Sequence, residues 1–394
     1  KCIHEKKLSQ KESEVIMMIE SKCGQQITFD IHKLSLRRGD SQVYLDFEKK
    51  LPDKIVYLKF NNMCNLNCSY CFQKNEEKSK YLAINIEKNL IDTLVDAHSI
   101  YLFGGEPFLK INYKNIEQIV ELCLKMNKKL FAFTNGVFNE EYFNLFRKYN
   151  DIFSSFTITI DGPKKLHDKR RILIGGSSYD RIISNMRELD LIGINFSIQI
   201  NIDNENIKEL SKLIRNIYDN KLNSHQIILN RVLHSNKSIT ELELLNLSVE
   251  LKSKFKDINF NINCPTLKKV KDFFFNHIIS THRCEVSSTY VIDFQNKVIY
   301  ACPENNNLII AKFEKDVDYD ISVRENIEFY NEKKECQSCL YKFFCGKGCI
   351  VDKDLKVEGC IEDVQQSLEY IFSNWNKFFS VDINDLFEEY TIIF

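Results

Sequence analysis

Three closely spaced cysteines are the residues best suited to chemistry in this sequence. Cys64, Cys68 and Cys71 form a C-x3-C-x2-C array, and Tyr70 and Phe72 flank the last thiol. Three thiolates on a short loop can hold three irons of a [4Fe–4S] cube and leave the fourth iron open. A structural zinc site usually has four ligands in two close pairs. We therefore interpret the trio as an iron–sulfur site, with half a zinc site as the less favoured alternative.

Seven further cysteines form a second array nearer the end of the chain. Seventeen residues separate the first two, and the next four follow a C-x2-C-x5-C-x3-C pattern. Seven thiols exceed the needs of one metal ion and nearly suffice for two four-iron cubes. A zinc ribbon over residues 336–349 is the alternative. The members of this second array are Cys284, Cys302, Cys336, Cys339, Cys345, Cys349 and Cys360.

The overall composition is that of an ordinary folded protein. Of 394 residues, 44% are hydrophobic and 28% are charged, a length that suits two or three domains. The net charge of -1 gives no general attraction to nucleic acid or anionic lipid. No apolar run reaches the roughly 18 residues of a membrane span, and no signal-peptide pattern opens the sequence. Because ten of the 14 cysteines fall into the two arrays, we expect a protein of a reducing cytoplasm, with no nucleic-acid or membrane partner.

The elements that must position the first array alternate between strand and helix. This alternation predicts an α/β fold, with a parallel sheet and helices outside it. Six βα units are two short of a closed eight-fold barrel, and active groups of parallel barrels lie at the carboxyl ends of the strands. Strands are predicted at 55–60, 100–103, 129–133, 156–160, 195–202 and 226–229, and helices at 84–98, 116–126, 140–149, 179–191, 207–220 and 240–255.

The segments on either side form smaller units. Apolar spacing predicts a helix over 9–23, followed by strands at 26–36 and 42–47 with a turn at Arg38-Gly39-Asp40. A helix and hairpin could form a winged-helix-type module that binds a leader peptide by strand addition, or a cap on the barrel. The stretch 267–275 is a basic, aromatic helix that we assign to core packing. The tail is predicted to be helical, packing through Leu368, Ile371, Phe372 and Trp375.

The first array and the strand ends after it resemble those of radical S-adenosylmethionine (radical SAM) enzymes. The stretch Gly104-Gly105-Glu106-Pro107 ends the second strand, where the family contacts the amino group of SAM. The resemblance implies a partial (β/α)6 barrel, a SAM-binding cluster, and a 5′-deoxyadenosyl radical that removes hydrogen from a C–H bond. The other positions that match SAM contacts of the family are Tyr70, Phe72, Thr159, Arg171 and Val232.

The second array resembles the SPASM extension of radical SAM enzymes, which carries two auxiliary [4Fe–4S] clusters. The family pattern assigns Cys336, Cys339, Cys345 and Cys360 to one cluster, and Cys284, Cys302 and Cys349 to the other. The three-thiolate cluster has either an open iron or a fourth ligand from Cys23 or Cys264. The family's glycine five residues before the second thiol is Lys297 here, so we expect that hairpin to turn at Gln295-Asn296.

The resemblance implies four segments and a peptide-modifying oxidoreductase. The segments are 1–50 for possible leader recognition, 51–275 for the barrel, 276–360 for SPASM and 361–394 for the tail. We expect a thioether or carbon–carbon cross-link in a ribosomal precursor peptide, with flavodoxin or ferredoxin as electron donor. A sulfatase-maturing, formylglycine-generating enzyme is the alternative. That subfamily has an Asp after the second auxiliary thiol, where this chain has Pro303 and Glu304. A zinc-stabilised binding protein is the alternative from another class.

Overall fold

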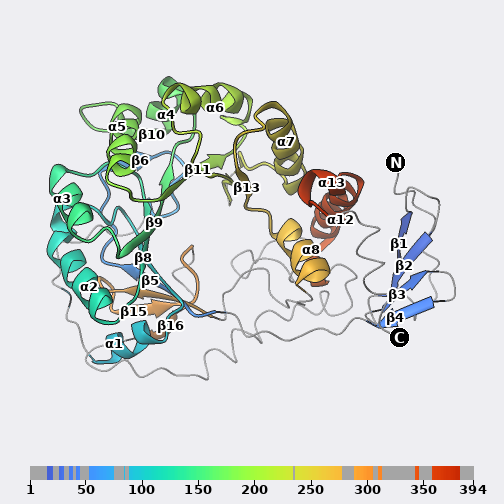
Figure 1. Cartoon of the computed structure of the whole chain (residues 1–394), viewed down its shortest axis with the longest axis horizontal. Coiled ribbons are helices and arrows are strands. Elements are labelled where there is room, and N and C mark those ends of the chain that lie inside the picture. Colours follow the sequence, from blue (N-terminus) through green and yellow to red (C-terminus); the bar gives the residue numbers. More distant parts are fainter. Residues whose placement is uncertain are drawn as a thin grey trace.

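One ten-stranded sheet organises the chain, in the order β13-β12-β11-β9-β8-β7-β5-β14-β15-β16 (Figure 1). The computed structural model describes residues 53–74, 84, 88–233, 236–276, 288–304, 309–312, 342–345 and 357–381, and four strands between 16 and 44. The strands of the large sheet are β5 Ile55–Lys59, β7 Ser99–Phe103, β8 Leu130–Thr134, β9 Phe153–Thr159, β11 Phe196–Ile202, β12 Ile227–Arg231, β13 Phe260–Ile262, β14 Thr289–Asp293, β15 Val298–Tyr300 and β16 Ile309–Lys312.

The predicted alternation of strand and helix is confirmed. The six predicted strands correspond to β5, β7, β8, β9, β11 and β12, which pair in parallel and in chain order. The sheet stays open, as expected for an incomplete barrel. Helices of this region are α1 Lys88–Val95, α2 Tyr113–Lys125, α3 Glu140–Lys148, α4 Lys164–Arg170, α5 Ser178–Leu191, α6 Leu210–Asp219, α7 Glu241–Lys254 and α8 Pro265–Phe275.

Two further parallel strands extend the predicted six. β13 pairs with β12 at one side, and β14 pairs in parallel with β5 at the other. β13 has only three residues, of which Asn261 is polar, so no period is visible in the sequence. β14 and β15 lie within the segment 276–360 but belong to the main sheet. β5, which leads into the cysteine loop, is therefore paired on both sides, with β7 and with β14.

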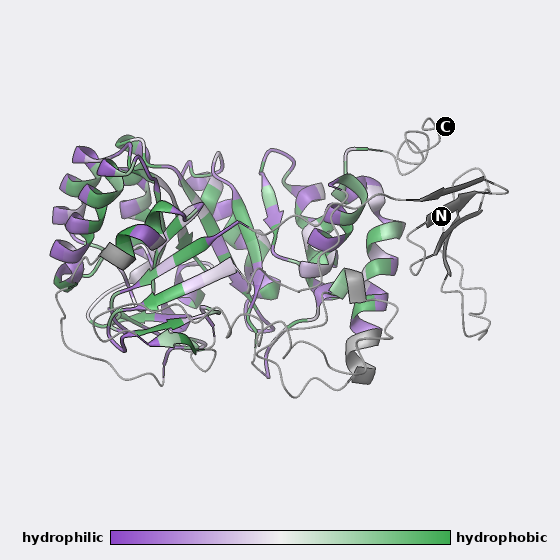
Figure 2. Cartoon of the chain, turned by 90° about the horizontal axis from the view of Figure 1, so that it is seen from below, coloured by the Kyte–Doolittle hydropathy of each residue, from purple (hydrophilic) through white to green (hydrophobic). Residues whose placement is uncertain are grey.

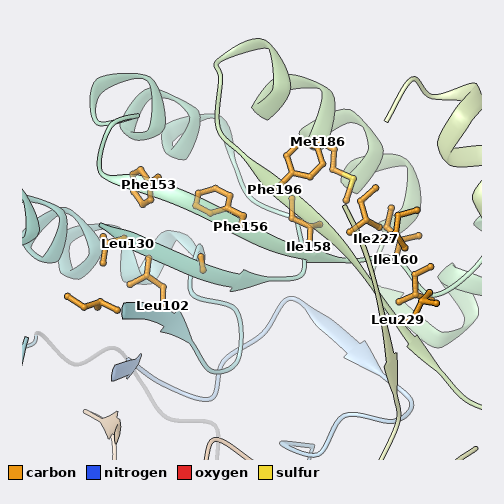
Figure 3. Close-up of a cluster of buried hydrophobic side chains, with 14 of the residues drawn as sticks. Leu102, Leu130, Phe153, Phe156, Ile158, Ile160, Met186, Phe196, Ile227 and Leu229 are labelled. Carbon is orange, nitrogen blue, oxygen red and sulfur yellow. The ribbon is translucent and has the colours of Figure 1, made fainter. Parts of the chain in front are cut away.

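Alternate residues of the parallel strands form the core between sheet and helices. Val56 and Leu58 of β5 are fully buried, whereas Ile55 and Tyr57 are half-buried. Burying a side chain of this size contributes about 1.5–3 kcal/mol. The outer helices carry both hydrophilic and hydrophobic residues, as expected for helices with one face on a sheet (Figure 2). Figure 3 shows part of this layer, which includes Leu102, Leu130, Phe156, Ile158, Ile227 and Leu229.

Local sequence explains where α7 begins. Thr240 Oγ1 accepts a hydrogen bond from Glu243 N at 3.1 Å, and the Glu243 carboxylate accepts from Thr240 N at 2.7 Å. This reciprocal capping box satisfies two backbone donors that a helix start would leave unpaired. The predicted start of this helix at residue 240 is thereby confirmed.

The prediction for the first segment was wrong in its helix. β1 Ile16–Glu20 pairs antiparallel with β2 Gln26–Asp30, so residues 16–20 are a strand. Four consecutive apolar residues occupy 16–19, and such a run suits a strand better than one helical face. β3 Ser35–Arg38 and β4 Ser41–Tyr44 complete this four-stranded sheet, so the predicted strand at 26–36 is two strands, β2 and β3. Arg38 pairs with Ser41, and Gly39 and Asp40 of the predicted turn lie outside the described residues. The winged-helix arrangement is not found among the described residues of 16–44.

The helices near the end of the chain pack as predicted. Phe274 of α8 contacts Phe372 of α12 Val357–Ser373 and Trp375 of α13 Trp375–Phe378. Leu368 and Ile371 are also buried. The aromatic residues of α8 therefore serve core packing, as expected. None of the described helices is long and apolar enough to cross a membrane.

Candidate functional site

The cysteine loop follows β5, at the carboxyl end of the parallel sheet. Within it, β6 Leu66–Cys68 pairs antiparallel with β10 Arg171–Leu173, and Cys68 lies opposite Arg171. Ser69 N also donates to Arg170 O at 2.8 Å. Sequence analysis missed both strands, because three residues are too few to show a period. Their pairing holds Arg171 against the cysteine loop, so two predicted site regions about a hundred residues apart meet.

The thiols lie in surroundings that suit metal-bound sulfur. Leu66 N and Asn135 Nδ2 lie 3.4 and 3.5 Å from Cys64 Sγ and donate to it. Burial raises the pKa of Cys64 to about 12 and also raises the pKa of Cys68. Such thiols stay protonated at neutral pH unless a metal takes the place of the proton. N–H groups directed at a ligand sulfur are one means by which proteins tune iron–sulfur clusters, so the residues fit one.

A single-ion site is a different arrangement. Among the described residues, no three His, Cys, Asp or Glu side chains lie close enough together to hold one metal ion. A four-iron cube binds its thiolates at separate irons, so its ligands stand farther apart than those of one zinc ion. The absence of such a group therefore argues against a single-ion site among the described residues, and it does not bear on a four-iron cluster.

Two glycines after β7 allow its turn to pack on the cysteine loop. Gly104 and Gly105 have φ values of +85° and +49°. A Cβ on Gly105 would lie 2.1 Å from the backbone oxygen of Met63, and Glu106 N donates to that oxygen at 2.7 Å. Gly105 N donates to Gln73 Oε1 at 2.9 Å. The turn thus touches the loop through backbone, which only glycine permits at this distance.

Glu106 is buried and already hydrogen-bonded. Its Oε1 accepts from Thr134 Oγ1 at 2.7 Å and from Phe108 N at 2.9 Å, and its Oε2 accepts from Asn135 N at 2.6 Å. Burial raises its pKa to about 7, and these donors act in the opposite direction. The carboxyl group therefore links the ends of β7 and β8. Its expected contact with the SAM ammonium group stays a prediction.

A buried polar network surrounds Tyr70. Its phenol bonds to the Asp161 carboxylate, and Arg171 Nη1 donates to the phenol oxygen at 2.7 Å. The same nitrogen lies 3.8 Å from Asp161 Oδ2. Asn201 donates to Asp161 through its backbone N at 3.0 Å and to Tyr70 through Nδ2 at 3.3 Å. Thr159 ends β9 and is buried, and it precedes Asp161 by two residues in the sequence. Sequence analysis identified Tyr70, Thr159 and Arg171 but missed Asp161 and Asn201.

The remaining predicted residues lie in different surroundings. Phe72 is 53% exposed. Val232 is buried just after β12, and its N donates to Ile202 O at 2.9 Å. Cys264 is buried and its thiol donates to Glu241 Oε2 at 3.5 Å, so this thiol already has a partner in the fold.

The side chains of two cysteines of the second array are described. Cys302 follows β15, Cys345 ends α11 Lys342–Cys345, and both are buried. The turn before β15 includes Gln295-Asn296, as expected, and Lys297 there has a φ of +53°. Cys23, Cys284, Cys336, Cys339, Cys349 and the side chain of Cys360 lie outside the described residues.

A buried ion pair joins the cysteine loop to the β14–β15 turn. Lys59 Nζ lies 3.2 Å from Asp293 Oδ2, with the two side chains 2% and 0% exposed. Phe294 N donates to Lys59 O at 3.0 Å, and Asn62 N donates to Gln295 Oε1 at 3.0 Å. The base of the cysteine loop and the hairpin that leads to Cys302 are therefore held together.

We expect Asp293→Asn to lower the free energy of unfolding by about 3–5 kcal/mol, because it removes the carboxylate that neutralises a buried ammonium group. Urea unfolding under anaerobic conditions would measure the loss. A double variant, Lys59→Met with Asp293→Leu, should recover at least about half of it, since no charge remains buried. Asp96→Asn is the control, because its pair with Lys54 is 3.9 Å long and Asp96 is 74% exposed. A loss from Asp293→Asn no larger than the control's would contradict the prediction.

Comparison with known proteins identifies relatives for part of the chain. Residues 58–217 match the family model of the Radical SAM superfamily. An uncharacterized protein of Methanocaldococcus jannaschii is 30% identical over 169 residues, 41% of this chain and 57% of that protein. The sporulation killing factor maturation protein SkfB of Bacillus subtilis is 25% identical over 161 residues, 40% of this chain and 38% of SkfB. Matches to three curated relatives span 57, 62 and 61% of their lengths.

Solved structures share the fold over more of the chain. Native anSMEcpe with bound AdoMet has a TM-score of 0.59 at 18% identity, and the match covers 86% of this chain and 100% of that chain. Streptococcus suis SuiB bound to precursor peptide SuiA has a TM-score of 0.59 at 16% identity, covering 76% and 72%. At these identities the similarity shows the fold alone.

Proposed function

We propose that the chain uses residues 58–217, which match the Radical SAM superfamily model, to cross-link a ribosomally made precursor peptide. The observation that carries the proposal is the β6–β10 pairing, which brings Arg171 and the Tyr70 network to a loop with three thiols. These groups are suited to binding a cluster and to binding SAM. The thiols can hold an iron–sulfur cluster, and a buried guanidinium beside them can bind a carboxylate or ribose.

The residues would divide the work as follows. Cys64, Cys68 and Cys71 would hold a [4Fe–4S] cluster, which together with SAM supplies a 5′-deoxyadenosyl radical. Arg171 and Tyr70 would orient SAM beside the open iron, and Asp161 and Asn201 hold those two side chains in place. The backbone of Gly104 and Gly105 would border the methionine end of SAM. The buried surroundings exclude water from the site.

A peptide substrate is supported by the relatives. SkfB is described as a maturation protein, and SuiB is described in complex with its precursor peptide. We propose that the four-stranded sheet of residues 16–44 binds a leader peptide by strand addition at its edge. We propose two auxiliary clusters, held by the cysteine sets given above, and flavodoxin or ferredoxin as electron donor. The role of the auxiliary clusters would be to remove the electron that remains when the substrate radical is oxidised.

The test uses short peptides encoded beside the gene, incubated anaerobically with the reconstituted chain, SAM and a reductant. The expected product has lost two hydrogens by mass and does not react with a hydrazide. A hydrazide-reactive product would instead indicate a formylglycine aldehyde. SAM cleavage with no change in any peptide would contradict a peptide substrate. Zinc in place of about twelve irons per chain would contradict the whole proposal.

A further inference from the structure

The face of the sheet opposite the helices differs in chemistry from one side to the other. Residues that alternate with the buried core face this way, and most remain half-buried. On β5, β7 and β8 most of these residues are aromatic, and the others are Ile55, Lys59 and Ser99. On β9, β11, β12 and β13 they carry hydroxyl and amide groups, except for Ile228. The parallel register places them in rows across the sheet, with Tyr57 beside Tyr101 and Asn201 beside Asn230.

The aromatic half consists of rings in mutual contact. Tyr101 stacks on Tyr57 and on Phe131, in each case with ring centroids 5.1 Å apart. It also lies 5.4 Å from Phe133, which meets Phe103 edge to face at 6.3 Å. Because these rings are half-buried, they present a continuous aromatic surface on the inner face of the sheet. Surfaces of this kind bind apolar and aromatic groups.

The amide half is a chain of hydrogen bonds that leads to the cysteine loop. Asn263 Nδ2 donates to Asn230 Oδ1 at 2.8 Å, and Asn230 Nδ2 donates to Asn201 Oδ1 at 3.0 Å. Gln199 Nε2 donates to the same oxygen at 3.0 Å, and Asn201 in turn donates to Tyr70. A side-chain amide has two donor hydrogens and two acceptor lone pairs, so each of these groups retains capacity for a further partner.

The described strand residues on this face carry little charge. Among the described residues of β5, β7, β8, β9, β11, β12 and β13 that point inward, Lys59 alone is charged, and it is 2% exposed and paired with Asp293. Arg171 of β10 and Asp161 lie at the end of the amide chain, where both contact Tyr70. Recognition of phosphate or carboxylate groups relies on Arg and Lys. Apart from Arg171, which is assigned to SAM, an anionic segment would find no Arg or Lys but the buried, paired Lys59 among these strand residues. A peptide group offers the donor and acceptor that an amide side chain can match.

We propose that this face binds an uncharged, extended segment of the substrate peptide. Its apolar or aromatic side chains would lie on the aromatic half, and its backbone would hydrogen-bond to the amide half. The inference rests on the proposed function and narrows its substrate class: the residues to be modified are flanked by neutral residues. Tyr57, Tyr101, Gln199 and Asn230 would determine specificity without taking part in the chemistry of SAM.

The test is a selection from an mRNA-display library of random seven-residue segments on the immobilised full chain, reconstituted with iron and sulfide and loaded with SAM. The expected wild-type pool is rich in aromatic and apolar residues and poor in charged ones. Asn230→Asp places a carboxylate on the amide half, so Lys and Arg should become at least about threefold more frequent in its pool. Gln199→Glu should give the same shift, and it serves if Asn230→Asp does not fold. Tyr101→Ser should lower the frequency of aromatic residues.

Asn246→Asp is the matched control, because Asn246 is exposed on α7 and bonds only to Leu242 O in its own helix. Its pool should equal the wild-type pool. The inference is overturned if the wild-type pool is rich in charged residues or does not rise above background. It is also overturned if both carboxylate variants select the wild-type pool. SAM cleavage without peptide is measured on each preparation, so failure of the radical SAM proposal shows separately from failure of the peptide-binding face.

Discussion

Replacing Cys64, Cys68 and Cys71 together with alanine is expected to abolish SAM cleavage and to remove about four irons per chain. The cause is the loss of every protein ligand to the proposed cluster. Cys64 and Cys68 are half-buried in a loop that β6–β10 pairing and the Met63–Glu106 hydrogen bond hold in place. The loop should therefore keep its fold without the sulfurs. Iron analysis and chromatographic assay of 5′-deoxyadenosine after anaerobic reconstitution measure the two effects.

Cys123→Ala is the matched control for this experiment. Cys123 is a fully buried thiol of α2, outside both cysteine arrays. Its removal costs at most a small cavity, so iron content and SAM cleavage should match the wild type. If the triple variant cleaves SAM at the wild-type rate, the proposed cluster site is wrong. If Cys123→Ala loses iron as the triple variant does, iron loss reports general damage and does not locate the site.

The sequence predicted the parallel core because burial there follows the chain locally. Each of the six strands places its apolar residues against the helices, and a run of that kind is visible without knowledge of the partner strand. The helix predicted in the first segment was wrong because burial along one chain does not decide its structure. The continuous apolar run at 16–19 favours a strand, but a strand also needs a partner, and pairing with β2 is not visible in the sequence. β6, β10 and β13 are three-residue strands whose existence depends on their partners.

The residues of the candidate site also differ in whether the sequence reveals them. The cysteine spacing, the two glycines and Arg171 are recognisable from residue type and distance along the chain. Asp161 and Asn201 are not, because each looks like an ordinary polar residue at a strand end until Tyr70 is brought between them. The role of Glu106 as a link between β7 and β8 was also not visible in the sequence. Two of its three donors, Thr134 and Asn135, lie at the end of the next strand. Polar networks need three-dimensional neighbours, and a sequence shows only linear ones.

Gly105→Ala is expected to displace the cysteine loop and to lower the free energy of unfolding by at least about 5 kcal/mol, which is most of the stability of a typical domain. The added Cβ would lie 2.1 Å from Met63 O, 2.8 Å from Met63 C and 2.9 Å from Asn62 C, all of them backbone atoms. Backbone cannot move aside as a side chain can, and Glu106 N holds the Met63 oxygen at 2.7 Å. Iron content after reconstitution should fall with stability, because the displaced residues lead directly into Cys64.

Gly175→Ala separates this clash from the cost of the backbone conformation itself. Gly175 also has a positive φ, +79°, but no atom lies within 4 Å of the position its Cβ would take. Alanine there should cost only about 1–2 kcal/mol, the penalty for a left-handed residue. Urea unfolding and iron analysis of the two variants in parallel isolate the contact between the β7 turn and the cysteine loop. Equal losses in both variants would mean that the turn does not support the loop, and the site would then depend on β6–β10 pairing alone.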